Sequence, residues 1–505
     1  MAFEPMYEEI KLNSRRRLCQ TQAVVEARLL PQPNIVIARV LSIACDGAVT
    51  ASEIFAGEAR YIGRVNFKVL FVDVDGKNHS MDYNADFSDK VADERIAAGL
   101  KAHFSASVLD TDILSVNAGE IKLASVVEIK LDADMDEQLR FLSGGGEGIY
   151  THDEPLEYCR LISGGSRTVT LNDVLSDVKI SRLLLAESKP VIYKRDTGVD
   201  CVTVEGAVIT EICGETEDGL LAGYRTVTNF SEEFSAEDAR PGDTALTAAA
   251  VTPKITLESE EDGRFLSLEY ALTVEYSVFA AQSCGAVIDA FSVTNELLTN
   301  VQSVDVYQNK LNATVTDRVE GNVTLDVSMP IVDNILAATA LRLNITNMPA
   351  GDGEATIEGI VSGNIIYYSA EANSKNSVAV ELPFSIKTRV DGVEPADELT
   401  GRGIVTDAVV KIRRGNEIDI RTGVAIELNA CRKCQKCVIT ELTAGEEREV
   451  PDAAISIHIA KSKETLWDVA KALGITPELV LVQNPNLTLP LGGGERIIAY
   501  RHLTK

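Results

Sequence analysis

The sequence contains one pattern three times, and this repetition constrains the fold more than any other feature. Three stretches alternate apolar and polar residues with the period of two that is typical of a β-strand, and each contains a glycine: Gly63, Gly206 and Gly359. A phenylalanine follows these glycines by 24, 24 and 25 residues, at Phe87, Phe230 and Phe384. Since each copy of an internal repeat forms one structural unit, the pattern predicts three copies of one all-β module.

A second glycine follows the first by 56, 57 and 56 residues, each time in a predicted turn: Gly119, Gly263 and Gly415. Glycine readily adopts the positive φ that hairpin turns need, so each copy is expected to close on a hairpin. The strands expected after these turns are residues 121–130, 265–276 and 417–428. We therefore predict a mainly β chain with three tandem antiparallel β-sandwich-like repeats. The alternative is one large β protein whose strands merely resemble one another.

The repeats and the segments between them divide the chain into seven parts. Glycine-rich composition around residues 143–168 is typical of a linker, and the basic run at residues 14–17 lies in a short extension that could start with a helix. The expected parts are an N-terminal extension (1–30), repeat 1 (31–142), a linker (143–168), repeat 2 (169–281), repeat 3 (282–430), a cysteine-containing linker (431–454) and a C-terminal domain (455–500).

Charge and composition exclude several classes of function. The formal net charge of −28 opposes binding to the phosphate backbone of nucleic acids. The acidic N-terminus lacks the basic start and apolar run of a secretory signal, and no window has about 18 consecutive apolar residues, so we expect no membrane span. The five histidines occur in no nucleophile or metal motif, and no glycine run continues into a phosphate-binding loop. We expect a cytoplasmic protein that is not an enzyme.

The C-terminal segment has a different pattern of elements. Residues 455–459 alternate as a short strand, residues 465–473 have helical spacing, and a second helix is expected from Thr476-Pro477, with Leu479, Val480 and Val482 facing inward. Asn484-Pro485-Asn486 ends that helix, and residues 495–500 are expected to form a closing strand. The sequence therefore predicts a small α+β domain with the order βααβ.

This segment resembles the LysM family in its residues as well as in its elements. The family's pattern is matched by Lys463-Glu464-Thr465-Leu466-Trp467, by Gly474 and by Asn484-Pro485-Asn486. The resemblance implies a shallow groove for N-acetylglucosamine polymers or a protein partner, formed by Lys463, Glu464, Thr465, Leu466, Asn484, Pro485, Asn486 and Leu487. The family usually has Gly-Asp where this chain has Lys463-Glu464, a departure that favours a protein ligand. Trp467 would be a core residue of that fold.

The repeats resemble the SPOCS spore-coat domain, which occurs in tandem before a C-terminal LysM module in spore morphogenetic proteins. The resemblance implies a protein of the mother-cell cytoplasm that is recruited to the forespore surface, where its LysM module contacts a coat morphogenetic ATPase. The resulting hypothesis is a non-enzymatic scaffold of spore-coat assembly. The alternative hypothesis is a peptidoglycan-binding envelope protein.

Three of the nine cysteines are clustered, at Cys431, Cys434 and Cys437. Two-residue spacing allows thiolates to converge on one ion, and His458 could supply a fourth ligand for a structural zinc. Two alternatives are oxidative cross-linking and an inert linker. Since no other feature indicates a ligand, the sequence predicts no cofactor apart from this zinc.

Overall fold

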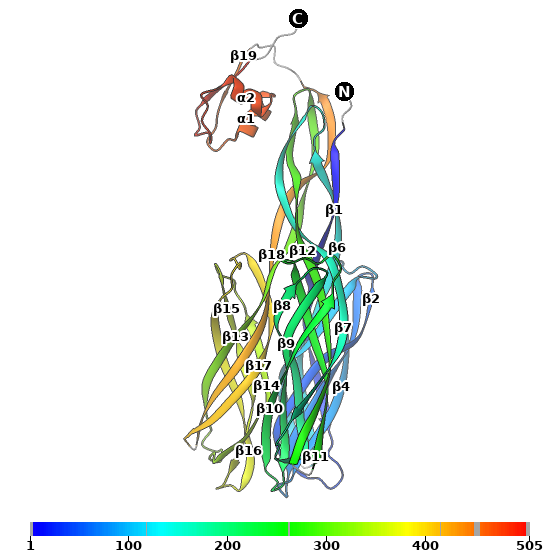
Figure 1. The fold of residues 1–505 in the computed structure, drawn as a ribbon, viewed down its shortest axis with the longest axis vertical. Helices are drawn as coiled ribbons and strands as arrows, with labels where there is room; N and C mark the ends of the chain where they lie inside the picture. The colour runs from blue at the N-terminus through cyan, green and yellow to red at the C-terminus, as the bar shows by residue number, and fades with distance from the viewer. Residues whose placement is uncertain (1–3, 118, 261–262, 415, 449–454, 501–505) are drawn as a thin grey trace.

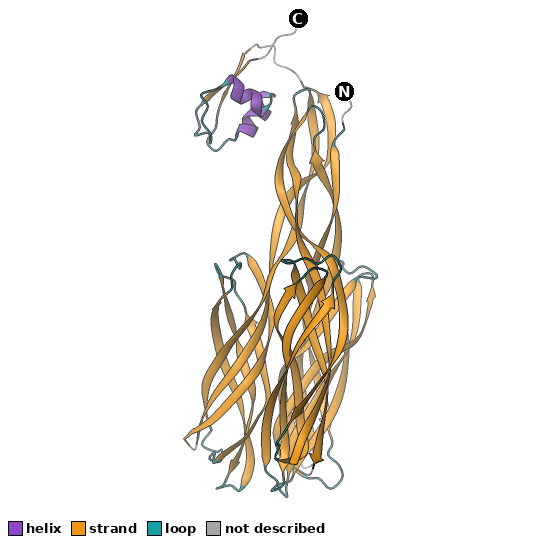
Figure 2. Cartoon of the chain, viewed as in Figure 1, coloured by secondary structure: helices purple, strands orange, loops and turns teal. Residues whose placement is uncertain are grey.

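The computed structural model describes residues 4–117, 119–260, 263–414, 416–448 and 455–500. Strands make up most of these residues, and the helices among them are two short ones near the C-terminus, as Figure 2 shows. All strand pairs between the named strands are antiparallel. The prediction of a mainly β chain with antiparallel sheets is therefore confirmed.

Three consecutive stretches of the chain, here called units 1, 2 and 3, have the same order of six strands. Unit 1 comprises β1 (Met6–Leu29), β2 (Ile37–Phe55), β3 (Glu58–Asp73), β4 (Asn78–Ala92), β5 (Lys101–Asn117) and β6 (Glu120–Gly144). Unit 2 comprises β7 (Ile149–Leu175), β8 (Ile180–Thr197), β9 (Cys201–Thr216), β10 (Leu221–Ser235), β11 (Thr244–Glu260) and β12 (Gly263–Ser292). Unit 3 comprises β13 (Asn295–Thr324), β14 (Asn334–Asn347), β15 (Glu354–Ser369), β16 (Ser374–Arg389), β17 (Asp397–Arg414) and β18 (Glu417–Glu447).

Each unit contains two three-stranded sheets. In unit 1, strands β2, β3 and β4 form a meander, while β6 lies between β1 and β5. Units 2 and 3 repeat this arrangement, with the orders β8-β9-β10 and β7-β12-β11, then β14-β15-β16 and β13-β18-β17. The first strand of each unit thus pairs with its last strand, which joins the two ends of the unit in one sheet.

The pairing of first and last strands corrects the domain boundaries expected from the sequence. The expected N-terminal extension (1–30) is mostly β1, without a starting helix, and it pairs with β6 from Met6 opposite Gly144 to Leu29 opposite Ile121. The expected linker (143–168) is largely β7, and the first part of the cysteine-containing linker (431–454) belongs to β18. Glycine in these strands marks close approach of a neighbouring strand rather than a linker, since a Cβ on Gly164 would lie 3.1 Å from the carbonyl oxygen of Tyr276.

The recurring glycine–phenylalanine spacing has a direct structural cause. The three pairs lie opposite each other on neighbouring strands: Gly63 with Phe87, Gly206 with Phe230, and Gly359 with Phe384. Each ring covers its glycine, because a Cβ would come within 2.6 Å of the ring in unit 2 and 2.7 Å in unit 3. The spacing therefore records a cross-strand contact in which an aromatic ring fills the place of the missing side chain.

The second glycine of each repeat marks the turn before the last strand. Gly119 lies between β5 and β6, and Gly263 begins β12 with a φ of 147°. Gly119 is not among the glycines with positive φ, so that expectation holds for Gly263 and not for Gly119. Gly415 lies outside the described residues.

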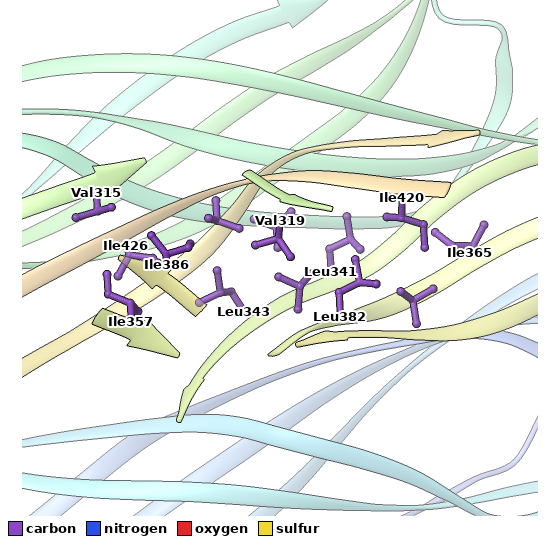
Figure 3. Packing of buried hydrophobic residues seen from close by; sticks show 14 of the residues in the cluster. Val315, Val319, Leu341, Leu343, Ile357, Ile365, Leu382, Ile386, Ile420 and Ile426 are labelled. Carbon is purple, nitrogen blue, oxygen red and sulfur yellow. The ribbon is translucent and has the colours of Figure 1, made fainter. Parts of the chain in front are cut away.

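Every unit has its own apolar core between its two sheets. In unit 1 the predicted alternation is confirmed, because Val65, Phe67, Val69 and Phe71 are at most 1% exposed. Figure 3 shows the core of unit 3, where Ile365, Leu382 and Ile420 pack together with residues of the other strands. The alternating pattern of each strand thus supplies one wall of its own unit's core.

Three further cores contain residues of all three units. Leu70, Cys213 and Ile366 lie seven residues after the three glycines, are 0% exposed, and belong to one cluster. Beyond the main body the long first and last strands of the units continue as a narrow stalk, visible in Figure 1. Its core takes residues from all three strand pairs: Ile10, Leu12, Leu139, Phe141, Leu156, Ala286, Val304, Val306 and Val438. The three units therefore surround common apolar centres.

A buried ion pair also joins unit 2 to unit 3. Arg195 Nη2 lies 2.5 Å from Glu427 Oε2, with side-chain exposures of 2% and 7%. Glu427 Oε1 also accepts the backbone N–H of Ile192 at 3.0 Å. Burial lowers the pKa of Arg195, while the Glu427 carboxylate opposes that shift. Units 2 and 3 are therefore joined by two buried charges that neutralise each other.

Candidate partner-binding module

Residues 455–500 form a separate small domain, here called the C-terminal module. It consists of β19 (Ile455–Ile459), α1 (Leu466–Leu473), α2 (Pro477–Gln483) and β20 (Arg496–Tyr500), the order that the sequence predicted. Thr465 caps α1 and Gly474 ends it with a φ of 64°, while Thr476 caps α2 with Pro477 at its first position. Local sequence signals therefore define both helices.

Replacing Thr465 by alanine is expected to destabilise the module by about 1 kcal/mol, because it removes an N-cap. Thr465 Oγ1 accepts the backbone N–H of Asp468 at 3.2 Å, and the Asp468 carboxylate accepts the Thr465 N–H at 2.9 Å. Hydrogen exchange of the α1 amides measures the effect. Thr488→Ala, at an exposed loop position, is the control; equal protection in both variants would show that the cap contributes nothing.

The first predicted groove loop is largely occupied by its own hydrogen bonds. Lys463 is exposed and has a φ of 67°, a conformation that glycine adopts more readily than lysine. Glu464 accepts the Lys461 N–H at 2.7 Å and lies 3.0 Å from His458 Nε2. The hydrogen bond with His458 lowers the pKa of Glu464. Leu466 packs against the module core, so its side chain is only partly exposed.

The second predicted groove loop also forms hydrogen bonds within the module. The Asn484 side chain donates to the carbonyl oxygens of Val480 at 2.9 Å and Ile498 at 2.8 Å, and it accepts the Ile498 N–H at 2.9 Å. Asn484 therefore ties α2 to β20. Leu487 packs against the core, which leaves Pro485 and Asn486 as the exposed side chains of this loop.

Helix α2 contributes less to the core than the sequence predicted. Val480 is 0% exposed, but Leu479 is 37% and Val482 is 75% exposed. The helix has seven residues, so its buried side spans one turn and only one of the three predicted residues reaches the core. The expectation for Leu479 and Val482 was therefore wrong.

The two-stranded sheet has an apolar face that points away from the helices, a feature that the sequence analysis missed. Ile455, Ile457 and Ile459 are 54%, 63% and 62% exposed. Ile498 lies opposite Ile457, Tyr500 opposite Ile455 and the exposed Arg496 opposite Ile459. The five apolar side chains of this face form what we call the outer face, and Arg496 lies at its edge. The Ile-Ser-Ile-His-Ile alternation indicates a strand, but it does not reveal that the isoleucines face solvent.

Trp467 does not occupy the centre of the module. It is half-buried, at the edge of the module core, and its Nε1 donates to Asp289 Oδ2 of β12 at 2.8 Å. The expectation of a core tryptophan was therefore wrong, because the side chain contacts another part of the chain.

The proposed zinc ligands are not brought together. Cys431, Cys434 and Cys437 lie along the extended strand β18, where residues three apart face opposite sides and lie about 10 Å apart. His458 contacts Glu464 instead. In the part of the chain that the structure describes, no group of three or more His, Cys, Asp or Glu residues is placed to hold a metal ion.

The chemistry of the cysteines agrees with this geometry. Burial raises the pKa of Cys431 to about 12, which opposes thiolate formation. The neighbouring cations have other partners, since Arg432 binds Asp397 and Lys433 binds Asp305. Cys437 is exposed, so oxidative cross-linking stays a prediction.

In a comparison with known protein families, part of unit 3 matches one family model. The family model described as "SipL, SPOCS domain" matches residues 332–413, from the segment before β14 into β17. No curated protein and no solved structure matches the chain. The match supports a SPOCS-like protein with a role related to sporulation or the spore coat, and hence a spore-associated location. Within the described residues, no helix is both long and apolar enough to cross a membrane.

Proposed function

We propose that this chain is a non-enzymatic scaffold of spore-coat assembly that acts in the mother cell at the forespore surface. The SPOCS match in unit 3 supports the spore-coat role. The extended β body with shared cores suits a rigid spacer, because each unit is held to the others. His79, His103 and His458 are held beside carboxylates of Asp73, Asp134 and Glu464. This arrangement suits a structural role for these histidines.

The C-terminal module, which we assign to the LysM type, is the proposed contact with a coat morphogenetic ATPase. The observation that carries this proposal is the outer face, where three isoleucines are more than half exposed. Contiguous exposed apolar side chains are typical of protein-binding surfaces. We therefore place the partner contact on the β19–β20 sheet.

Peptidoglycan binding is the alternative function. Sugar hydroxyls require free polar side chains, yet Glu464, Thr465 and Asn484 already bond within the module. Lys463, Thr465 and Asn486 are the exposed polar residues among the predicted groove residues, and Thr465 Oγ1 is already bonded to Asp468. This distribution favours a protein ligand over a glycan.

Replacing Ile457 by arginine is expected to weaken binding of the full-length protein to a purified coat morphogenetic ATPase by about tenfold or more. The added charge would lie on the outer face, where it disrupts apolar contact without entering the core. Titration calorimetry measures the affinity. Val482→Arg is the matched control, because Val482 is 75% exposed on α2.

This titration and a sedimentation assay with peptidoglycan together distinguish the scaffold function from the envelope function. Equal affinity of wild type and Ile457→Arg would contradict the proposed contact surface. Sedimentation of the wild type with purified peptidoglycan, reduced by Asn486→Ala, would support the envelope alternative.

A further inference from the structure

We propose that the end of the β7–β12 pair is a docking site for the C-terminal module of the same chain, and that this contact is a latch that opens while the module stays folded. The latch joins α1 to residues that lie far away in the sequence. It goes beyond the proposed function, because it concerns the helical side of the module rather than the outer face.

The docking site consists of two cross-strand pairs, here called the tip platform. His152 lies opposite Asp289, and Tyr150 lies opposite Phe291. These pairs are two residues apart on each strand, so all four side chains share one face. The Tyr150 and Phe291 rings stack at 5.4 Å between centroids. A register shift between Val287 and Asp289 redirects the strand just before the platform.

Trp467 of α1 sits on this platform. Its ring meets Phe291 edge-on at 4.9 Å between centroids and lies 5.4 Å from the ring of His152. Its Nε1–H donates to Asp289 Oδ2 at 2.8 Å. The apolar body and the polar atom of the indole therefore both have partners outside the module.

Lys471 provides the second anchor. It lies one helical turn after Trp467, on the same side of α1, and its Nζ donates to both Asp289 oxygens at 2.6 and 2.8 Å. Arg448 adds a bridge, because it donates to the Lys471 carbonyl oxygen at 3.1 Å and to the Ser292 carbonyl oxygen at 3.3 Å. One carboxylate, Asp289, thus holds both side-chain anchors.

The platform belongs to unit 2 alone among the three stalk ends. At the corresponding ends, Met6 lies opposite Gly144 in unit 1, and Leu297 lies opposite Ala444 in unit 3. These two pairs contain no aromatic ring and no acidic side chain, so they do not repeat the tip platform.

The latch can open because its ion pair is accessible to solvent. Asp289 is 34% and Lys471 is 43% exposed, so water and salt compete with the ion pair. Val469, Val480 and Ile497 come from three elements of the module, are each 0% exposed and belong to one cluster, which Phe291 of the tip platform also joins. The latch therefore requires that the contacts among these module residues persist when Phe291 is withdrawn. In the docked position the outer face stays exposed. A partner on the outer face is compatible with a closed latch, whereas a ligand on the Trp467 side must open it.

Trp467 is the only tryptophan, so its fluorescence in the full-length protein reports the latch. Asp289→Ala is expected to shift the emission to longer wavelength and to raise the acrylamide quenching constant about twofold, because the undocked population grows. Lys471→Ala is expected to act in the same direction. Asp153→Asn is the matched control, since Asp153 is an exposed acid beside His152 on the same strand.

Hydrogen exchange of the Val469 and Ala470 amides completes the test. Unchanged protection in Asp289→Ala, together with the fluorescence shift, would support a latch that opens between folded parts. An emission spectrum and quenching equal to the wild type would overturn the docking. Loss of amide protection would overturn the latch, because the module would then need the platform to fold. Ile457→Arg is expected to leave the fluorescence unchanged, so failure of the proposed partner contact is recognised separately.

Discussion

Replacing Glu427 by alanine is expected to lower the free energy of unfolding by about 3 to 5 kcal/mol, because it leaves Arg195 buried without a counter-charge. The Arg195 side chain is 2% exposed, so water cannot replace the lost carboxylate. The same change removes the acceptor of the Ile192 N–H. Urea denaturation of the full chain measures the stability, and hydrogen exchange at Ile192 shows whether the boundary between units 2 and 3 opens first.

The matched control is an exposed ion pair on neighbouring strands of unit 3. Arg421 Nε lies 3.2 Å from Glu320 Oε1, with side-chain exposures of 64% and 54%. Glu320→Ala is expected to cost less than about 1 kcal/mol. Similar losses for Glu320→Ala and Glu427→Ala would contradict the claim that burial makes the Arg195–Glu427 pair important.

Replacing Gly206 by alanine is expected to destabilise unit 2 by roughly 3 kcal/mol, because the added Cβ meets fixed atoms on both sides. It would collide with the carbonyl oxygen of Val191 and lie 2.6 Å from the ring of Phe230. A carbonyl oxygen in a paired strand cannot move aside without breaking the ladder. Thermal unfolding of the full chain, followed by circular dichroism, measures the loss.

Two other glycines provide the comparison. A Cβ on Gly285 would meet nothing within 4 Å, so Gly285→Ala is expected to be nearly neutral. A Cβ on Gly63 would meet only the ring of Phe87 among its three nearest atoms, and a ring can rotate. We therefore expect Gly63→Ala to cost less than Gly206→Ala. The reverse order would contradict the argument from fixed backbone atoms.

The sequence predicted those features that depend on neighbouring residues or on hairpin partners. The glycine–phenylalanine spacing of 24 or 25 residues indicated repeats, and the structure shows that it is a contact between adjacent strands of a meander. The helices predicted over residues 465–473 and from Thr476-Pro477 are both present, with caps at Thr465 and Thr476, because caps act within one turn.

The candidate site was predicted less well. The groove residues were chosen by resemblance, and Asn484 turned out to be a brace between α2 and β20. The exposed isoleucines of β19 were missed, since period-two alternation gives a strand without saying which side is covered. The cysteine spacing suggested convergence, but an extended backbone separates the thiols.

By itself the sequence determined that the chain is mainly β, that its strands alternate, and that a βααβ domain follows them. These properties come from local periodicity and local hydrogen bonds. The tertiary structure alone decided that β1 pairs with β6, that the units share common cores, and that Trp467 reaches Asp289. Those contacts join residues more than 90 positions apart. Pairing over such distances is set by packing and burial of the whole chain rather than by any local pattern.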